Sequence, residues 1–286
     1  MNRNQRTLQS VVSCSGIGIH SGKDVHLTIH PAPVNHGIKF VRTDLLNSPD
    51  ISAVFNQVVD TSLATVIGYD GFIVSTIEHL MAAFAGLSID NARVEIDAYE
   101  MPIMDGSAGP FTDLILNGGI EVQDSPKCYF AIKKPTELKV GGKFVGMYPS
   151  PVFKISYTIE YDHPLINKQS NTFEISEKTF QHDISRARTF GFLDEYEMLK
   201  RYGLAKGGSL DNVVVIDGNE IMNPEGLRYP DEFVRHKVLD CIGDFSLLGM
   251  PILGHVVVGK SGHAFNHMFL KKLFSEKASW ETCNWA

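Results

Sequence analysis

Two segments of the chain, one in each half, carry the same succession of signals, and this repetition constrains the fold more than any other feature. In the first, an apolar helical stripe over residues 75–86 precedes a strand over residues 92–97. In the second, a helix over residues 230–249 precedes a valine-rich strand near Val256. Each segment has a glycine three residues before an isoleucine: Gly86 and Ile89, Gly249 and Ile252. A short repeat of this kind predicts a duplicated domain.

Length and turn signals extend this prediction to the whole chain. With 286 residues, 43% of them hydrophobic, the chain can bury a substantial core and exceeds the usual length of one domain. Residues 118–127, GGIEVQDSPK, have the turn chemistry expected of a boundary. We predict an α+β fold of two similar domains, residues 1–125 and 126–286, each a two-layer sandwich of sheet and helix. Their helices would face each other across an interface, a common location for an active site.

Charge and cysteine content exclude several classes of function. Acidic residues outnumber basic ones by 33 to 26, so the chain lacks the basic surface of a nucleic-acid binder. The four cysteines include no C-x-x-C pair, which fits a reducing compartment and argues against a cysteine zinc site. No signal peptide is evident, and residues 245–259 are too short and interrupted to span a membrane. We expect a cytoplasmic protein with a small-molecule substrate, no transmembrane segment and no obligate protein partner.

The segment DEFVRHKVLDCIGDF, residues 231–245, predicts an amphipathic helix with a polar stripe. At about 100° per residue, His236, Asp240 and Asp244 stand on the face opposite the apolar side chains. An imidazole and a carboxylate one turn apart can bind one divalent ion. The same pattern is typical of a solvated helix face, and spacing alone favours that alternative.

The segment TIEHLMAAFAG places Glu78 and His79 in the first turn of the other helix. Ser75 and Glu78 could form a capping box, and His79 could be a surface residue. Alternatively, the helix N-terminus would keep the imidazole neutral and available to a metal. A carboxylate beside such a histidine suits metal-assisted hydrolysis, because the metal acidifies water and the carboxylate accepts its proton. The residues leave both alternatives open.

The segment GKSGHAFNH, residues 259–267, is a glycine-bracketed turn after the valine strand. His263 could donate a proton to a leaving amine, and Lys260 could contact a phosphate. If Asp244 reaches His263, it would keep that ring charged. The alternative is a turn that only ends the strand, with Lys260 solvated.

Seven blocks along the chain together resemble one known family. They are GIGIHSGK, STIEHLMAAFAGLSIDN, PIMDGSAGPF, ISRARTFGF, LAKGGSLDN, NPEGLRYPDEFVRHKVLDCIGD and GKSGHAFNH. In this order, from about residue 5 to residue 280, they resemble the UDP-3-O-acyl-N-acetylglucosamine deacetylases of lipid A biosynthesis in Gram-negative bacteria. The resemblance implies a hydrolase that releases acetate from an acylated UDP-GlcNAc, with its site between the helices of two similar domains.

The resemblance also implies a metal centre. It matches His79, His236 and Asp240 to the ligands of one catalytic zinc ion, Zn2+, and leaves the fourth position for water. Two imidazoles and one carboxylate would also accept Fe2+, so the sequence does not fix the metal.

Four further residues match catalytic groups of the family. Glu78 matches the general base that activates water, and His263 matches the protonated histidine that assists the leaving amine. Asp244 matches the carboxylate partner of that histidine. Thr189, in RARTFGF, matches a hydroxyl that donates to the oxyanion.

The resemblance assigns the nucleotide end of the substrate to aromatic and basic residues. Phe190 matches an aromatic residue near the sugar, and Tyr161 lies where the family places an aromatic ring against uracil. Lys237 and Lys260 match basic residues on the nucleotide side, which would supply the local positive charge that the composition lacks.

The acyl chain would enter an apolar passage in a strand–helix–strand insertion, residues 192–215, bounded by Phe192 and Val215. Family members often have cysteines in this passage and near residue 64. This chain has Ala205, Asn212 and Ala64 there. The acyl-chain length therefore does not follow from the resemblance.

Two rival functions make different predictions about these residues. A non-catalytic nucleotide-sugar binding protein of the same fold would be expected to lack a metal ligand or Glu78, and all are present. A metal-dependent phosphoesterase often uses a carboxylate-rich site for two metal ions, whereas two histidines and one aspartate suit a single ion. The sequence therefore favours the deacetylase.

Overall fold

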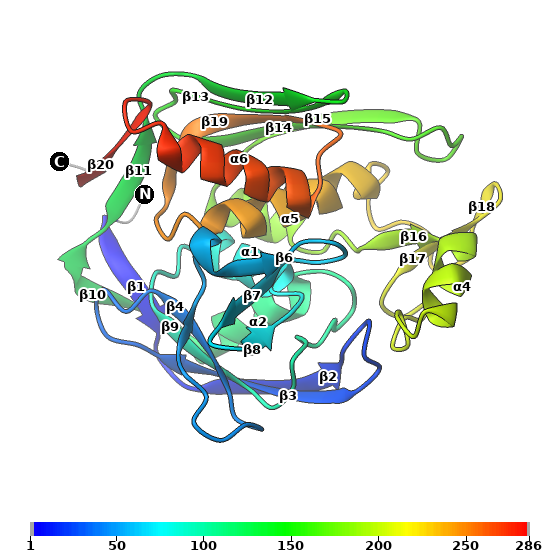
Figure 1. Cartoon of the computed structure of the whole chain (residues 1–286), viewed down its shortest axis with the longest axis horizontal. Helices are drawn as coiled ribbons and strands as arrows, with labels where there is room; N and C mark the ends of the chain where they lie inside the picture. The colour runs from blue at the N-terminus through cyan, green and yellow to red at the C-terminus, as the bar shows by residue number, and fades with distance from the viewer. Residues whose placement is uncertain (1–2, 285–286) are drawn as a thin grey trace.

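The body of the protein consists of two sheets with four helices between them, as the computed structural model of residues 3–284 shows (Figure 1). The first sheet has the strand order β2–β3–β9–β4–β5, with bounds Val12–Ile17, Asp24–Pro31, Ala92–Ile96, Ile38–Arg42 and Ile51–Ser52. The second has the order β12–β13–β19–β14–β15, with bounds Thr136–Val140, Lys143–Tyr148, Ile252–Gly259, Phe153–Glu160 and Lys168–Glu174. Beside β19 this sheet continues through β11 (Cys128–Ile132) and β20 (Trp280–Asn284). The fold class is therefore α+β.

The two sheets share one topology. β9 follows α1 (Glu78–Gly86) and lies antiparallel to β3 and parallel to β4. β19 follows α5 (Glu232–Ser246) and lies antiparallel to β13 and parallel to β14. This repeated order confirms the prediction of two similar domains, each with a layer of sheet and a layer of helices.

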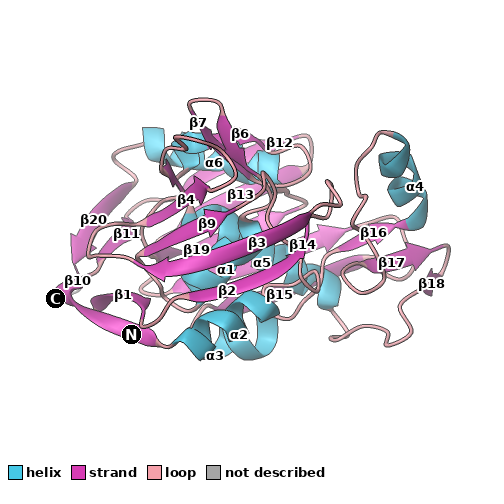
Figure 2. Cartoon of the chain, turned by 90° about the horizontal axis from the view of Figure 1, so that it is seen from below, coloured by secondary structure: helices cyan, strands magenta, loops and turns pink. Residues whose placement is uncertain are grey.

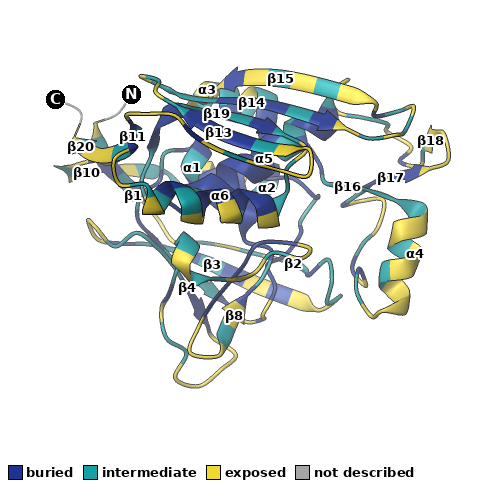
Figure 3. Ribbon diagram, turned by 45° about the horizontal axis from the view of Figure 1, so that its top comes forward, coloured by how far each residue is buried: buried dark blue, intermediate teal, exposed yellow. Residues whose placement is uncertain are grey.

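The helical layers consist of α1, α2 (Gly109–Gly118), α5 and α6 (His263–Ser275), with α1 packed directly against α5. Both of these helices are buried along most of their length (Figure 3). Where they meet, a Cβ on Gly243 would stand 2.1 Å from the carbonyl oxygen of Glu78. Glycine therefore permits a backbone approach that a side chain would prevent. No helix within residues 3–284 is long and apolar enough to cross a membrane.

Shorter elements flank this body. A small sheet near α1 consists of β6 (Val58–Asp60), β7 (Val66–Tyr69) and β8 (Phe72–Val74), after the 3-10 turn η1 (Phe55–Gln57). The short α3 (Glu177–Thr179) continues into the π-helical turn η2 (Phe180–Ile184). The insertion expected over residues 192–215 is part of a longer unit, which consists of β16 (Phe190–Phe192), α4 (Leu193–Arg201), β17 (Val214–Asp217) and β18 (Glu220–Ile221). It projects from one end of the layered body (Figure 2).

Three predictions of local structure are wrong. Residues 118–127 contain the strand β10 (Ile120–Pro126) instead of a turn, because its backbone pairs with β1 (Asn4–Leu8). The first helix begins at Glu78 and not at Ser75, whose backbone N–H donates to the Tyr99 carbonyl (2.8 Å). The segment treated as a turn around His263 continues as α6, whose first residue is that histidine.

Candidate active site

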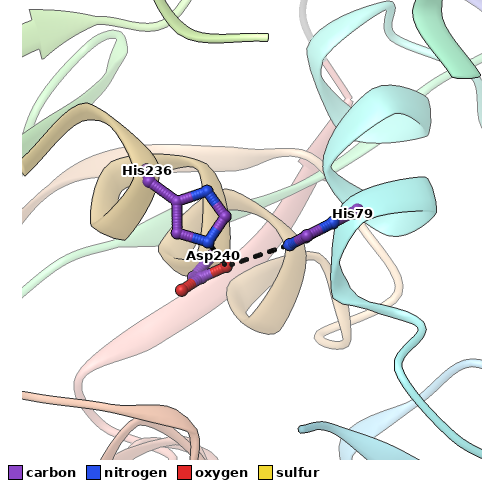
Figure 4. Close-up of side chains that lie close together, drawn as sticks. All are labelled: His79, His236 and Asp240. Atoms are coloured by element: carbon purple, nitrogen blue, oxygen red, sulfur yellow. Dashed lines mark ion pairs between the residues drawn. The ribbon is translucent and has the colours of Figure 1, made fainter. Parts of the chain in front are cut away.

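Three side chains that could hold a metal ion meet at the interface of α1 and α5. His79 comes from the first turn of α1, and His236 and Asp240 stand one turn apart on α5 (Figure 4). One ligand atom from each lies within 4.8 Å of the others. All three side chains are buried, so the solvated helix face considered for α5 is wrong. That face is covered by α1.

The distances within this cluster suit a single metal ion. The Asp240 Oδ1 atom lies 3.4 Å from His236 Nε2 and 3.7 Å from His79 Nε2. Two ligands at about 2 Å from a tetrahedral ion would stand roughly 3.3 Å apart, so small side-chain movements would complete such a site. Two imidazoles and one carboxylate form a donor set typical of catalytic metal sites with an open position.

Hydrogen bonds prepare the ligands for this role. His236 Nδ1 lies 3.0 Å from the carbonyl oxygen of Ala187, which leaves Nε2 free to face the cluster. Burial lowers the pKa of His236 to about 3, so the ring is neutral. Burial opposes the ionisation of Asp240, but the neighbouring side chains, among them the Lys237 cation, outweigh burial and hold the Asp240 pKa well below its usual value. The Lys237 Nζ atom donates to Asp240 Oδ2 (2.9 Å).

Glu78 lies beside the cluster and is not a helix cap. No side chain caps the N-terminus of α1. Instead, Glu78 Oε2 accepts a hydrogen bond from the backbone N–H of Thr65 (3.0 Å). The capping-box alternative is therefore wrong, because Ser75 is occupied in a bridge to Glu100. Burial raises the pKa of Glu78, so this carboxylate accepts a proton more readily than an exposed one would.

His263 faces Glu78 from the other side and is paired with Asp244. Its Nδ1 atom lies 2.9 Å from Asp244 Oδ2, and its Nε2 atom lies 3.7 Å from Glu78 Oε1. Burial alone would lower the pKa of His263, but Asp244 and Glu78 outweigh burial and raise it to about 10. The imidazolium persists at the N-terminus of α6, where the helix dipole disfavours a cation, because the two carboxylates are closer.

Two buried residues that the sequence analysis did not identify complete this arrangement. The Thr65 hydroxyl donates to Asp244 Oδ1 (2.6 Å), and the Asn266 side-chain amide donates to Asp244 Oδ2 (2.8 Å). Thr65 thus contacts both Glu78 and Asp244. Asn266 stands in the quoted block GKSGHAFNH, one turn after His263, and this helical spacing was the available signal. No local pattern distinguishes Thr65.

Thr189 is positioned through its backbone. Its N–H donates to the Gly106 carbonyl of the first domain (2.8 Å), and its own carbonyl accepts from Val214 (2.8 Å). It follows Ala187, whose carbonyl contacts His236, by two residues. The segment that contacts His236 therefore also carries the Thr189 hydroxyl.

The aromatic and basic residues assigned to the substrate gather mainly next to His236. The centre of the Phe190 ring lies 6.4 Å from that of the His236 ring and 5.9 Å from that of the Tyr161 ring. The Lys237 Nζ atom lies 5.6 Å from the centre of the Phe190 ring. Phe192 lies 6.3 Å from Tyr161. These side chains form one wall beside the cluster.

Two other assigned residues lie at the margins of that wall. The Lys260 ammonium group is paired with Glu160 (2.7 Å), just before Tyr161 in the chain, and is about half exposed. Val215 is buried in β17, opposite Gly191 of β16. Because Lys260 is paired with Glu160, it must release this carboxylate before it can bind an anion.

A large cavity lies elsewhere in the protein. It measures about 490 Å³ and is lined by the second half of α1, the end of α5 and neighbouring loops, including Phe84, Ile242 and Leu253. None of the residues assigned to the site lines it. The candidate site is therefore identified by the His79–His236–Asp240 cluster with Glu78, Asp244 and His263 beside it, and not by this cavity.

Duplicated domains with a cluster between them that could hold a metal ion, and with a buried carboxylate and a charged histidine beside it, are the arrangement expected of a metal-dependent hydrolase. A model of the family described as UDP-3-O-acyl N-acetylglycosamine deacetylase matches residues 5–275. The chain belongs to this family.

Similar proteins occur in several bacteria. The UDP-3-O-acyl-N-acetylglucosamine deacetylase of Myxococcus xanthus is 52% identical over 97% of this chain and 88% of its own length. Its counterpart in Teredinibacter turnerae is 50% identical, over 97% of this chain and 92% of its own. That of Acidithiobacillus ferrooxidans is 49% identical, over 99% and 93%. The similarity thus covers both domains and the whole site.

Proposed function

We propose that this protein hydrolyses the N-acetyl group of UDP-3-O-(3-hydroxyacyl)-N-acetylglucosamine and releases acetate. The observation that carries the proposal is the placement of Glu78 and His263 beside the His79–His236–Asp240 cluster, with 3.7 Å between Glu78 Oε1 and His263 Nε2. Amide hydrolysis requires a group that accepts a proton from water and a group that gives one to the leaving amine. A base and an acid facing each other at a metal-binding cluster meet both needs.

We assign the metal as one zinc ion, with Fe2+ as the alternative, held by His79, His236 and Asp240. When bound, such an ion supplies Lewis acidity, which lowers the pKa of water and polarises a carbonyl oxygen. The two neutral imidazoles and one carboxylate support this assignment because they leave a fourth position open.

The residues around the cluster then divide the proton transfers. Glu78 accepts the proton of the attacking water, and its raised pKa suits this step. The Thr189 hydroxyl donates to the oxygen that becomes negative as the carbonyl carbon turns tetrahedral. His263, kept charged by Asp244, gives a proton to the amine nitrogen as the C–N bond breaks. Acetate and the free amine leave.

The wall of Phe190, Tyr161 and Lys237 supports binding of the UDP-sugar beside His236. Aromatic faces suit a sugar and a uracil ring, and Lys237 and Lys260 offer positive charge for the diphosphate. The insertion, from Phe192 to Val215, would line the passage for the acyl chain.

We place this activity in the cytoplasm and propose a domain boundary near residue 125. Residues 1–125 would supply Glu78 and His79, and residues 126–286 would supply the other catalytic groups. The end of β10 at Pro126 and the start of β11 at Cys128 support that boundary.

The test is acetate release from UDP-3-O-acyl-GlcNAc substrates of graded chain length, with and without a chelator. We expect acetate and the free amine in equal amounts, loss of turnover with chelator and recovery on addition of Zn2+. Glu78→Gln, which keeps the shape of the side chain, is the matched control for contaminating activity. Release of a nucleotide or phosphate instead of acetate would contradict the proposal.

A further inference from the structure

The segment of residues 187–189 performs two tasks at the site. The Ala187 carbonyl contacts His236 Nδ1 (3.0 Å) and thereby fixes which ring nitrogen faces the metal cluster. Thr189 carries the hydroxyl assigned to the oxyanion. Arg188 lies between Ala187 and Thr189 in the sequence. Its side chain takes part in neither task and makes its hydrogen bonds to other residues.

The Arg188 side chain is only 1% exposed and is held at every nitrogen. Its Nε donates to Glu232 Oε1 (2.9 Å) and its Nη2 to Glu232 Oε2 (3.2 Å), which makes a bidentate pair. Nη2 also donates to the Gly226 carbonyl (2.6 Å), and Nη1 contacts Glu225. The Arg188 backbone N–H donates to Glu232 Oε1 as well (2.9 Å). Main chain and side chain of one residue are thus tied to a single carboxylate.

Glu232 belongs to the same helix as the metal ligands. It is fully buried in the first turn of α5, four residues before His236. The Arg188–Glu232 pair therefore fixes the distance between α5, which carries the His236 ring, and the segment whose carbonyl orients that ring. A ring held at two points whose separation is fixed has little freedom to rotate.

Energetics argue that this pair has more than a stabilising role. Removing two charges from water opposes folding and offsets much of their attraction, so a buried ion pair is weak evidence for stability. Its planar, two-point geometry does, however, specify orientation in a way that a lysine cannot.

We infer that Arg188 is a positioning residue, which raises metal affinity by holding the Ala187 carbonyl in place against His236. The inference rests on the metal centre of the proposed function and deepens it. Partners that orient a ligand in this way typically contribute 10–100-fold to metal affinity or activity.

The test compares Arg188→Lys with Arg42→Lys in the full-length chain. Arg42 is a matched control, because its guanidinium also binds a carboxylate through two nitrogens, Asp44 at 2.8 and 2.6 Å, but in the first sheet away from the cluster. Three quantities are measured: zinc affinity by chelator competition, the absorption spectrum of the Co(II)-substituted protein, and the thermal midpoint of the metal-free protein.

We expect Arg188→Lys to weaken zinc binding by about 10–100-fold and to change the cobalt spectrum. We expect Arg42→Lys to change neither. A lowered thermal midpoint in Arg188→Lys with unchanged affinity and spectrum would reduce Arg188 to a structural residue and overturn the inference.

Glu232→Gln covers the case in which Arg188→Lys does not fold. This variant keeps the shape of the buried side chain and removes the charge that binds the Arg188 guanidinium. A loss of zinc affinity would support the inference, and unchanged affinity would overturn it. Because zinc binding is measured without substrate, an unmodified protein that binds zinc but releases no acetate would contradict the proposed function alone.

Discussion

The two central helices occupy matching places in the duplicated fold but contribute different chemistry. α1 and α5 each precede the central strand of their own sheet. α1 contributes Glu78 and His79, both from its first turn, whereas α5 contributes His236, Asp240 and Asp244 from successive turns. Duplication therefore explains where the site lies, and divergence of the two helices explains what each side can do.

The largest contrast concerns metal retention, which depends mainly on α5. We expect Asp240→Ala to lose bound zinc, because it removes the ligand that faces both histidines. Turnover should fall to that of the chelated protein. Metal analysis after dialysis measures this, and full occupancy would remove Asp240 from the ligand set.

Glu78→Ala tests the other side of the comparison. We expect zinc to stay bound while the rate falls by about two to four orders of magnitude, the usual scale for a lost proton-transfer group. Metal content and kcat are measured on the same sample. Near-normal turnover would mean that α1 supplies only a ligand.

A pH profile of activity tests the role of Asp244, the third of the α5 residues. The charge of Asp244 contributes to the raised pKa of His263, so a variant without that charge should have a lower one. Because the charged ring is needed to protonate the amine, activity falls as the pH rises through its pKa. In Asp244→Asn the alkaline fall of kcat/KM should therefore move to lower pH. An unchanged alkaline limb would show that another group controls it.

The same pair predicts a pH-dependent contribution to folding. The folded-state pKa of His263, about 10, lies above the ordinary value of 6.5. The pair therefore stabilises the protein fully below about pH 6.5, and this stabilisation is lost as the pH rises toward 10. Denaturant titration of metal-free protein at several pH values measures it, with Asp244→Asn as the comparison.

The smallest expected effect concerns the contact between the helices. A methyl group on Gly243 would meet the Glu78 carbonyl, so Gly243→Ala should separate α1 from α5. We expect the free energy of unfolding to fall by about 1–3 kcal/mol, the usual range for overpacking. Gly259→Ala, at the end of β19, would make only an ordinary 3.7 Å contact with Phe144 and also lacks a positive φ, so it controls for the general effect of replacing a glycine. Equal losses in both variants would contradict close packing as the cause.

The sequence predicted the duplicated fold because each half carries its own periodic helix and strand. It could not predict how far the helices cover each other, so the polar face of α5 remained ambiguous until His79 was placed against it. Residues 118–127 contain good turn residues, yet they form β10 because β1 supplies backbone partners about 115 positions away. Local sequence propensity carries no information about pairing between segments so far apart in the chain.

The site residues also divide into those that the sequence pattern reveals and those that only the tertiary contacts reveal. His236, Asp240 and Asp244 are visible as a helical spacing, and the family blocks assign their roles. Thr65 was not identified because its contact with Asp244 joins residues 179 positions apart. Arg188 lies in the family block ISRARTFGF, but its burial against Glu232 follows only from the tertiary structure.

The proposed ligands lie on both sides of the domain interface, so a metal ion bound by them would link the two halves thermodynamically. Neither half alone holds all three donors, so an ion that requires all three binds only when the domains are docked. By linkage, free ion at 100 times its dissociation constant would favour the docked state by about 2.7 kcal/mol. Scarcity of the ion would then loosen the whole molecule as well as stop the reaction.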